Sequence, residues 1–278
     1  MSAQFSEEVK KGKRFEFGKN WQNFSLFLND QRIAEAELSL KKMLDLESLE
    51  GKSFLDIGSG SGLFSLAARR LGARVHSFDY DSDCVTCTQE LKRRFFLEDD
   101  KWVIEQASVL DINYMKSLGQ FDIVYSWGVL HHTGSMWQAL NNTALAVTIQ
   151  GKIFIAIYND QGSQSKLWLM VKRFYCSGLI LKLIILALII PFFITGGFLA
   201  DVFKKVNPIN RYLSCKNKRG MRIFNDWFDW LGGLPFEVAK PEEIFSFFNS
   251  KDFVLKKLKT VSGKLGCNEY VFLKQEKI

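Results

Sequence analysis

The sequence predicts an α/β fold in which helices cover both faces of a parallel sheet. Two observations predict it. Short apolar segments alternate with helical patterns between about residues 50 and 160, which is typical of βαβ units. The first such segment ends in Asp56, and Gly58, Gly60 and Gly62 follow at every second position. A bend of this kind lets the backbone turn sharply and approach a ligand closely.

The predicted elements follow in a regular order. Apolar residues at helical spacing predict a helix at 31–49. The βα pattern predicts strands at 53–57, 74–79, 102–106, 121–127 and 153–158, and helices at 63–71, from the second strand to residue 96, and at 135–148. After a break of about 75 residues, Pro241 followed by two acidic residues marks another helix start. Two last strands are expected at 253–261 and 269–274.

The break divides the chain into four predicted parts. These are an N-terminal helical lid at 1–49, a Rossmann-like core at 50–160, a hydrophobic and basic cap insertion at 161–236, and the remaining core at 237–278. The insertion follows the fifth strand at the carboxyl edge of the sheet, where open α/β sheets bind ligands. We therefore expect it to cover or wall the substrate site.

The glycine bend does not fit a dinucleotide site. That fingerprint needs glycine where this chain has Leu63, and Asp56 would repel a pyrophosphate. A cationic ligand explains the carboxylate better. Asp79 ends the second strand 23 residues later, where it can accept hydrogen bonds from both hydroxyls of a ribose. A helix N-cap is the alternative role for Asp79.

Two segments resemble methyltransferase motifs. Residues 54–62 (FLDIGSGSG) are similar to motif I of the class I S-adenosylmethionine (SAM) methyltransferases, and residues 121–133 (FDIVYSWGVLHHT) to motif IV of small-molecule methyltransferases, including those of ubiquinone and menaquinone synthesis. The resemblance implies a seven-stranded Rossmann-like sheet with helices on both faces and a mostly helical insertion after strand five. It also implies SAM as the cofactor and methyl transfer as the reaction.

The resemblance assigns cofactor contacts to several loops after the strands. Many relatives have Asp at the position of Ser108, so backbone atoms of Ser108 and Val109 are expected to make the adenine contact instead. The implied cofactor-binding residues are Asp56, Gly58, Ser59, Gly60, Gly62, Asp79, Tyr80, Ser108, Val109, Trp127 and Gly128.

A histidine pair follows the fourth strand, near the place where the family delivers the methyl group. A neutral imidazole suits removal of a hydroxyl proton. We therefore expect His132, or next His131, to be a general base, with oxygen as the acceptor atom. The alternative is that a histidine only packs against the cofactor or bonds to the backbone.

Four residues are candidates for substrate contacts. Asn159 and Asp160 end the fifth strand and can orient a substrate, although capping of the next helix is an equal alternative. In the insertion, Arg211 is expected to hold a phosphate or carboxylate, with lipid head groups or solvent as the alternative. Trp230 is expected to belong to an aromatic substrate wall, unless this segment only packs.

The insertion is both apolar and basic. Residues 183–200 carry no charge, and residues 166–222 contain eleven basic residues and one acid, Asp201. A single membrane crossing would divide one sheet between two sides of a bilayer. The sequence therefore predicts either peripheral contact with an anionic membrane through 179–205 or a buried cap over the active site. We expect a cytoplasmic protein that, in the first case, lies on the inner face of a membrane.

Metal ions and nucleic acids are not expected as partners. Cys84 and Cys87 form the only close cysteine pair. Residues 121–133 have neither the Asn/Asp-Pro-Pro-Tyr/Phe pattern of base-amine methylases nor the Pro-Cys nucleophile of cytosine-C5 enzymes. The sequence thus predicts an enzyme that methylates a small-molecule or lipid-linked acceptor. The alternatives are an RNA (tRNA) methyltransferase and a SAM-binding regulatory protein without turnover.

Overall fold

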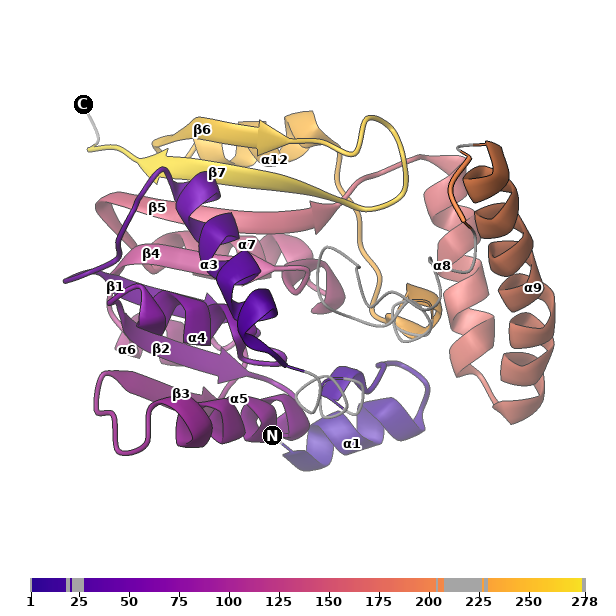
Figure 1. Ribbon diagram of the computed structural model, residues 1–278, viewed down its shortest axis with the longest axis horizontal. Coiled ribbons are helices and arrows are strands. Elements are labelled where there is room, and N and C mark those ends of the chain that lie inside the picture. The colour runs from indigo at the N-terminus through magenta and orange to yellow at the C-terminus, as the bar shows by residue number, and fades with distance from the viewer. Residues whose placement is uncertain are drawn as a thin grey trace.

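The computed structural model describes residues 2–18, 21, 28–203, 205–207, 227 and 230–276. Its centre is a seven-stranded sheet with the strand order β3-β2-β1-β4-β5-β7-β6 (Figure 1). The strands are β1 (Ser53–Ile57), β2 (Arg74–Asp79), β3 (Trp102–Gln106), β4 (Phe121–Trp127), β5 (Val147–Tyr158), β6 (Phe253–Lys259) and β7 (Cys267–Lys274).

Neighbouring strands among β1 to β5 pair in parallel, and β7 is antiparallel to both β5 and β6. The predicted α/β fold with a late hairpin is confirmed, and the first four strands have the predicted bounds. β5 begins six residues earlier than expected, because Val147 pairs with Phe121 across an irregularity in the register. The apolar pattern does not mark this polar first part of the strand.

Helices cover both faces of the sheet. On one face, α3 (Asp30–Leu44), α4 (Leu63–Arg70) and α5 (Ser82–Phe95) bury Ile33, Leu66 and Leu91 against Phe54 and Trp102. On the other, α6 (Ile112–Ser117), α7 (Met136–Leu145) and α12 (Pro241–Asn249) bury Met115, Leu140 and Phe248 against Leu55 and Ile155. Successive side chains of β1 point to opposite faces of the sheet, so Phe54 belongs to one hydrophobic core and Leu55 to the other. The six-residue helix α6 was not predicted.

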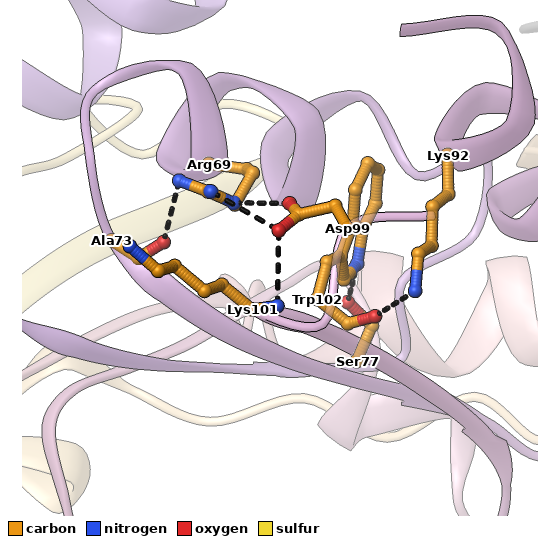
Figure 2. A network of polar contacts seen from close by, with 7 residues as sticks. All are labelled: Arg69, Ala73, Ser77, Lys92, Asp99, Lys101 and Trp102. Atoms are coloured by element: carbon orange, nitrogen blue, oxygen red, sulfur yellow. Dashed lines mark hydrogen bonds and ion pairs between the residues drawn. The ribbon is translucent and has the colours of Figure 1, made fainter. Parts of the chain in front are cut away.

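A polar network holds α4 and α5 to the start of β3 (Figure 2). The Arg69 guanidinium donates to both carboxylate oxygens of Asp99, at 2.5 and 3.2 Å. The Lys92 ammonium donates to the Trp102 carbonyl at 2.6 Å, and the Trp102 indole donates to Ser77 Oγ at 2.9 Å. This last bond joins the side chains of β3 and its neighbour β2.

Two helices follow β5, as the predicted insertion requires. α8 (Ser163–Cys176) lies beyond the carboxyl end of the sheet, and α9 (Leu179–Phe203) packs on its outer side (Figure 1). The 25 residues of α9 have the length and composition to cross a membrane, with a mean hydropathy of 2.6 in the most apolar window. The N-terminal helix α1 (Ser2–Lys10) lies near α5, across the same end of the sheet.

Candidate active site

A cavity of about 980 Å³ lies at the carboxyl ends of the central strands. This volume is at the upper end of the range for small-molecule sites. Most of the residues predicted from the sequence line it together: Asp56, Gly58, Ser59, Gly60, Asp79, Tyr80, Ser108, Val109, Trp127, Gly128, His132 and Trp230.

The loop after β1 needs glycine at its first bend. Gly58 has a φ of +76°, and a Cβ there would lie 2.4 Å from the Val129 side chain. The backbone amides of Gly58 and Ser59 both donate to the Phe78 carbonyl, at 2.9 and 3.1 Å. The loop is therefore held closely between the ends of β2 and β4, and its backbone forms one wall of the cavity.

Asp79 forms the next part of this wall. Its Oδ2 accepts the backbone N–H of Gly60 and its Oδ1 that of Asp81, each at 2.9 Å. Asp81, rather than Asp79, caps α5, because its side chain accepts the N–H of Asp83. Burial raises the pKa of Asp79 to about 6, although both N–H bonds oppose this shift. The carboxylate keeps accepting capacity for further donors.

Asp56 ends a chain of buried hydroxyls. The Trp102 indole donates to Ser77 Oγ, Ser77 Oγ lies 2.8 Å from Ser65 Oγ, and Ser65 donates to Asp56. Since Ser65 gives its proton to the carboxylate, Ser77 must be the donor to Ser65. Burial nevertheless raises the pKa of Asp56 to about 7. This carboxylate is a costly charge unless a cationic ligand lies nearby.

Residues after β2 and β3 form a third wall. Ser108 Oγ accepts the N–H of Leu110 at 3.2 Å, and the Val109 carbonyl accepts from the Asn142 amide at 2.8 Å. The Ser108 hydroxyl thus stabilises the turn of its own loop. After β2, the Tyr80 ring meets the Phe5 ring edge to face, with centroids 5.6 Å apart.

The two histidines of the 3₁₀ helix η1 (Leu130–His132) have different surroundings. His132 lines the cavity, and its Nδ1 lies 2.6 Å from the carbonyl oxygen of Pro235. A carbonyl only accepts, so Nδ1 carries the proton and Nε2 holds the lone pair. Burial, followed by the positive charges of Lys172 and Arg14, lowers the pKa of His132 to about 3, so the imidazole is neutral at pH 7.

His131 is fully buried and is not among the cavity-lining residues. Its ring packs on that of Tyr158 at 4.0 Å, and its Nδ1 accepts the Tyr158 backbone N–H at 3.4 Å. His131 therefore holds the end of β5 behind the cavity wall, and of the two it is His132 that a bound molecule can reach.

The N-terminal segment closes one side of the cavity. Phe15, Phe17 and Trp21 line it, and the Gly18 amide donates to Asp81 Oδ2 at 2.9 Å. Arg14 donates to Glu8 at 2.7 Å and to the His132 carbonyl at 3.0 Å, and its guanidinium lies 5.0 Å from the centre of the Tyr80 ring.

Some predicted residues lie elsewhere. Gly62 is the N-cap residue before α4, where a Cβ would lie 2.9 Å from Thr88 Cα, so this glycine allows α4 to pack on α5. Asn159 accepts from the amide of Asn268 in β7 at 3.0 Å, and Asp160 accepts the Gly162 N–H at 2.8 Å in the loop before α8. The side-chain cap of α8 that was the alternative role is not formed by either residue. Neither lines the cavity. Arg211 lies outside the described residues.

Sequence reasoning missed several lining residues. Lys259 and Glu269 come from β6 and β7 and pair at 2.7 Å. No local motif marks them, because only the hairpin's position in the sheet brings them to the cavity. Tyr158 lines the cavity at the end of β5, where its place beside Asn159 was a usable signal. In the described part of the chain, no three His, Cys, Asp or Glu side chains gather as metal ligands.

The methyltransferase domain family matches residues 28–179, which is more than half of the chain. The chain belongs to this family. The cavity suits SAM as a ligand, because the buried carboxylate of Asp56 and the half-buried one of Asp79 line a space bordered by glycine backbone. A Cβ on Gly128 would meet nothing within 4 Å, so that wall of the cavity is open to a ligand.

The methyltransferase is also similar to individual proteins. It is 40% identical over 84 residues to the ribosomal protein L11 methyltransferase of Prochlorococcus marinus, a match that covers 29% of this chain and 27% of that protein. The chain thus matches about a quarter of the length of this relative.

Two solved structures have the same fold. Magnesium protoporphyrin IX methyltransferase from Synechocystis has a TM-score of 0.51 at 14% identity, over 88% of this chain and 83% of that one. The putative methyltransferase in a complex with the Trm112 activator of Haloferax volcanii has a TM-score of 0.55 at 12% identity, over 96% of this chain and 99% of that one.

Proposed function

We propose that this methyltransferase transfers the methyl group to a hydroxyl oxygen of a small-molecule or lipid-linked acceptor, with His132 as the general base. The single observation that carries the proposal is the hydrogen bond from His132 Nδ1 to the Pro235 carbonyl. It leaves the lone pair on Nε2 of a residue that lines the cavity.

Asp56, Asp79 and the glycine backbone between them are the residues that would hold SAM. When bound, SAM supplies an electrophilic methyl group on a sulfonium that leaves as a neutral thioether. Asp79 offers its remaining lone pairs to the ribose hydroxyls, as the buried acid does in other nucleoside sites. Asp56 places negative charge in the cavity beside a cationic ligand.

His132 performs the proton transfer of the proposed reaction. As the acceptor oxygen forms its bond to the methyl carbon, its O–H bond breaks and the proton moves to Nε2. Burial lowers the pKa of His132 to about 3 in the empty cavity, so the imidazole is neutral at pH 7 but only weakly basic. It takes the proton as bond formation to the methyl carbon places positive charge on the acceptor oxygen and acidifies its O–H. The Pro235 carbonyl accepts from Nδ1 and so stabilises the imidazolium that results.

The surroundings of His132 favour an apolar acceptor. The Phe17 ring lies 5.0 Å and the Tyr158 ring 5.3 Å from the imidazole, and both residues line the cavity. Such a wall provides contacts to aromatic or isoprenoid carbon and few polar partners. A phenolic or other hydroxyl carried on an apolar body fits this arrangement.

The acceptor can be found with methyl-labelled SAM. The purified protein is incubated with the label and, separately, with a metabolite and lipid extract or with total RNA. We expect an alkali-stable methyl ether in the organic phase. Label confined to RNA would overturn the small-molecule assignment, and binding of SAM without any labelled product would indicate a regulatory role.

His132→Asn tests the base itself. The asparagine amide can still donate to Pro235, but the Nε2 lone pair is lost. We expect turnover to fall by about 10²- to 10⁴-fold, while SAM affinity stays within about twofold and a higher pH partly restores turnover of a phenol. His131→Asn, the matched control, keeps an acceptor for the Tyr158 amide and should retain turnover within a few-fold. Equal turnover of His132→Asn and the wild type would exclude His132 as the base.

A further inference from the structure

Helix α9 exposes apolar side chains over most of its circumference. Leu188 and Phe192 are each 68% exposed and Phe203 is 86% exposed. In the most apolar 18-residue window of the helix, none of the residues is buried. Soluble monomers rarely leave so large and continuous an apolar surface in water, so α9 requires a partner that covers it.

The topology limits what that partner can be. β5 comes before α9 and β7 after it, yet these strands pair directly, with Ile155 opposite Tyr270. Both ends of α9 are therefore on the same side of any bilayer. The sequence from 204 to 222 is rich in basic residues and too polar to return as a second span. An apolar helix with this constraint can lie in one leaflet but cannot cross the membrane.

The charges around α9 indicate the chemistry of the surface. Lys166, Arg173, Lys182 and Lys205 are exposed on α8, on α9 and just beyond it. The only acid between residues 166 and 222, Asp201, is buried. Among the described residues from 166 to 207, exposed cations border the apolar face and no acid is exposed. This arrangement complements anionic lipid head groups above an acyl layer.

The geometry points to a docking surface for an anionic phospholipid bilayer, formed by the exposed side of α9 and the cations that flank it. The surface adjoins the active site. The Phe193 ring of α9 lies 5.7 Å from that of Trp230, which itself lines the cavity. Docking would thus bring the bilayer near the wall of the acceptor cavity, whichever acceptor the enzyme uses.

Vesicle flotation tests this inference without reference to activity. The full chain is mixed with vesicles of phosphatidylcholine alone or with equal parts of phosphatidylglycerol. We expect at least about tenfold stronger binding to the anionic vesicles, and about fivefold weaker binding after Lys182→Gln. The double variant Leu188→Asp/Phe192→Asp should lose vesicle binding, and so should Phe203→Asp at the other end of the helix.

Leu97→Asp is the matched control, because Leu97 is 72% exposed and lies far along the chain, between α5 and β3. It should bind vesicles as the wild type does. Equal binding by Leu97→Asp and the double variant would overturn the inference. Absence of binding to either vesicle, with dimers in solution that Leu188→Asp/Phe192→Asp dissociates, would instead show that a second copy covers α9.

Discussion

Asp79 joins the ends of two neighbouring strands, because its Oδ2 accepts the backbone N–H of Gly60, which follows β1, at 2.9 Å. A second bond, from the Asp81 N–H to Oδ1, fixes the carboxylate from the other side. The side chain is thus positioned before any ligand binds. Burial still raises its pKa to about 6, so its charge is sensitive to mild acid.

Asp79→Asn should weaken SAM binding by about 1–3 kcal/mol at pH 7.5, because the amide replaces one accepting oxygen by a donor. In the wild type, affinity should also fall as the pH drops below about 6, where the carboxyl becomes protonated. Calorimetric titration with SAM measures both effects. Asp83→Asn, a change at a half-buried residue in the first turn of α5 that does not line the cavity, is the control and should bind normally. Wild-type affinity in Asp79→Asn would mean that this carboxylate does not contact the ribose.

The central strands and the cofactor loops were predictable because their signals are local. Phe54 to Gly60 contains an apolar strand, its terminal acid and the glycines of the bend within one short segment. The ambiguity at Asp79 was also local: a nearby acid had to cap α5, and only the geometry assigns that role to Asp81.

Contacts between distant segments could not be predicted in this way. The carbonyl that sets the tautomer of His132 belongs to Pro235, 103 residues later. Arg14 reaches the His132 carbonyl from the other end of the chain, 118 residues away. A turn of polar residues such as Asn159 and Asp160 has the same sequence signal whether it meets a substrate or only its own loop.

Glycine at position 58 is required for more than its backbone angle. Gly58 and Gly119 have φ values of +76° and +74°, but only a Cβ on Gly58 would meet other atoms, at 2.4 Å from Val129. The conformational cost alone should therefore lower the free energy of unfolding of Gly119→Ala, by about 1–2 kcal/mol. In Gly58→Ala the free energy of unfolding should fall further, because the new Cβ also meets Val129. This variant should also bind SAM less tightly, since the loop must move. Urea denaturation of both variants separates the conformational cost from the cost of the contact with Val129. Equal decreases in the free energy of unfolding would contradict the packing role of Gly58.

Arg14 should control access through the N-terminal segment, which we expect to act as a lid. Arg14→Ala removes its bonds to Glu8 and to the His132 carbonyl. Chymotrypsin should then cleave at Phe15 and Phe17 faster, and SAM should dissociate roughly tenfold faster, as expected for one charge-assisted hydrogen bond. Lys11→Ala, which removes an exposed pair with Glu7 in the same segment, is the control. Unchanged cleavage and dissociation in Arg14→Ala would show that the segment is not held by this side chain.

Asp56 should make the cofactor-free enzyme less stable as the pH rises. Its pKa is about 7 in the folded protein against an ordinary value of 3.8 for a solvated aspartate, so between these pH values the folded state binds the extra proton. Stability therefore decreases as the pH rises through this range. Asp56→Asn has no such proton, and its Tm advantage over the wild type should grow from pH 5 to pH 8. Asp99→Asn should behave in the opposite way and lower the Tm at both pH values, because the Arg69 guanidinium lowers the pKa of Asp99 (Figure 2). A Tm difference between Asp56→Asn and the wild type that does not change with pH would mean that burial does not raise the pKa of Asp56. The argument for a cationic ligand beside this carboxylate would then be lost.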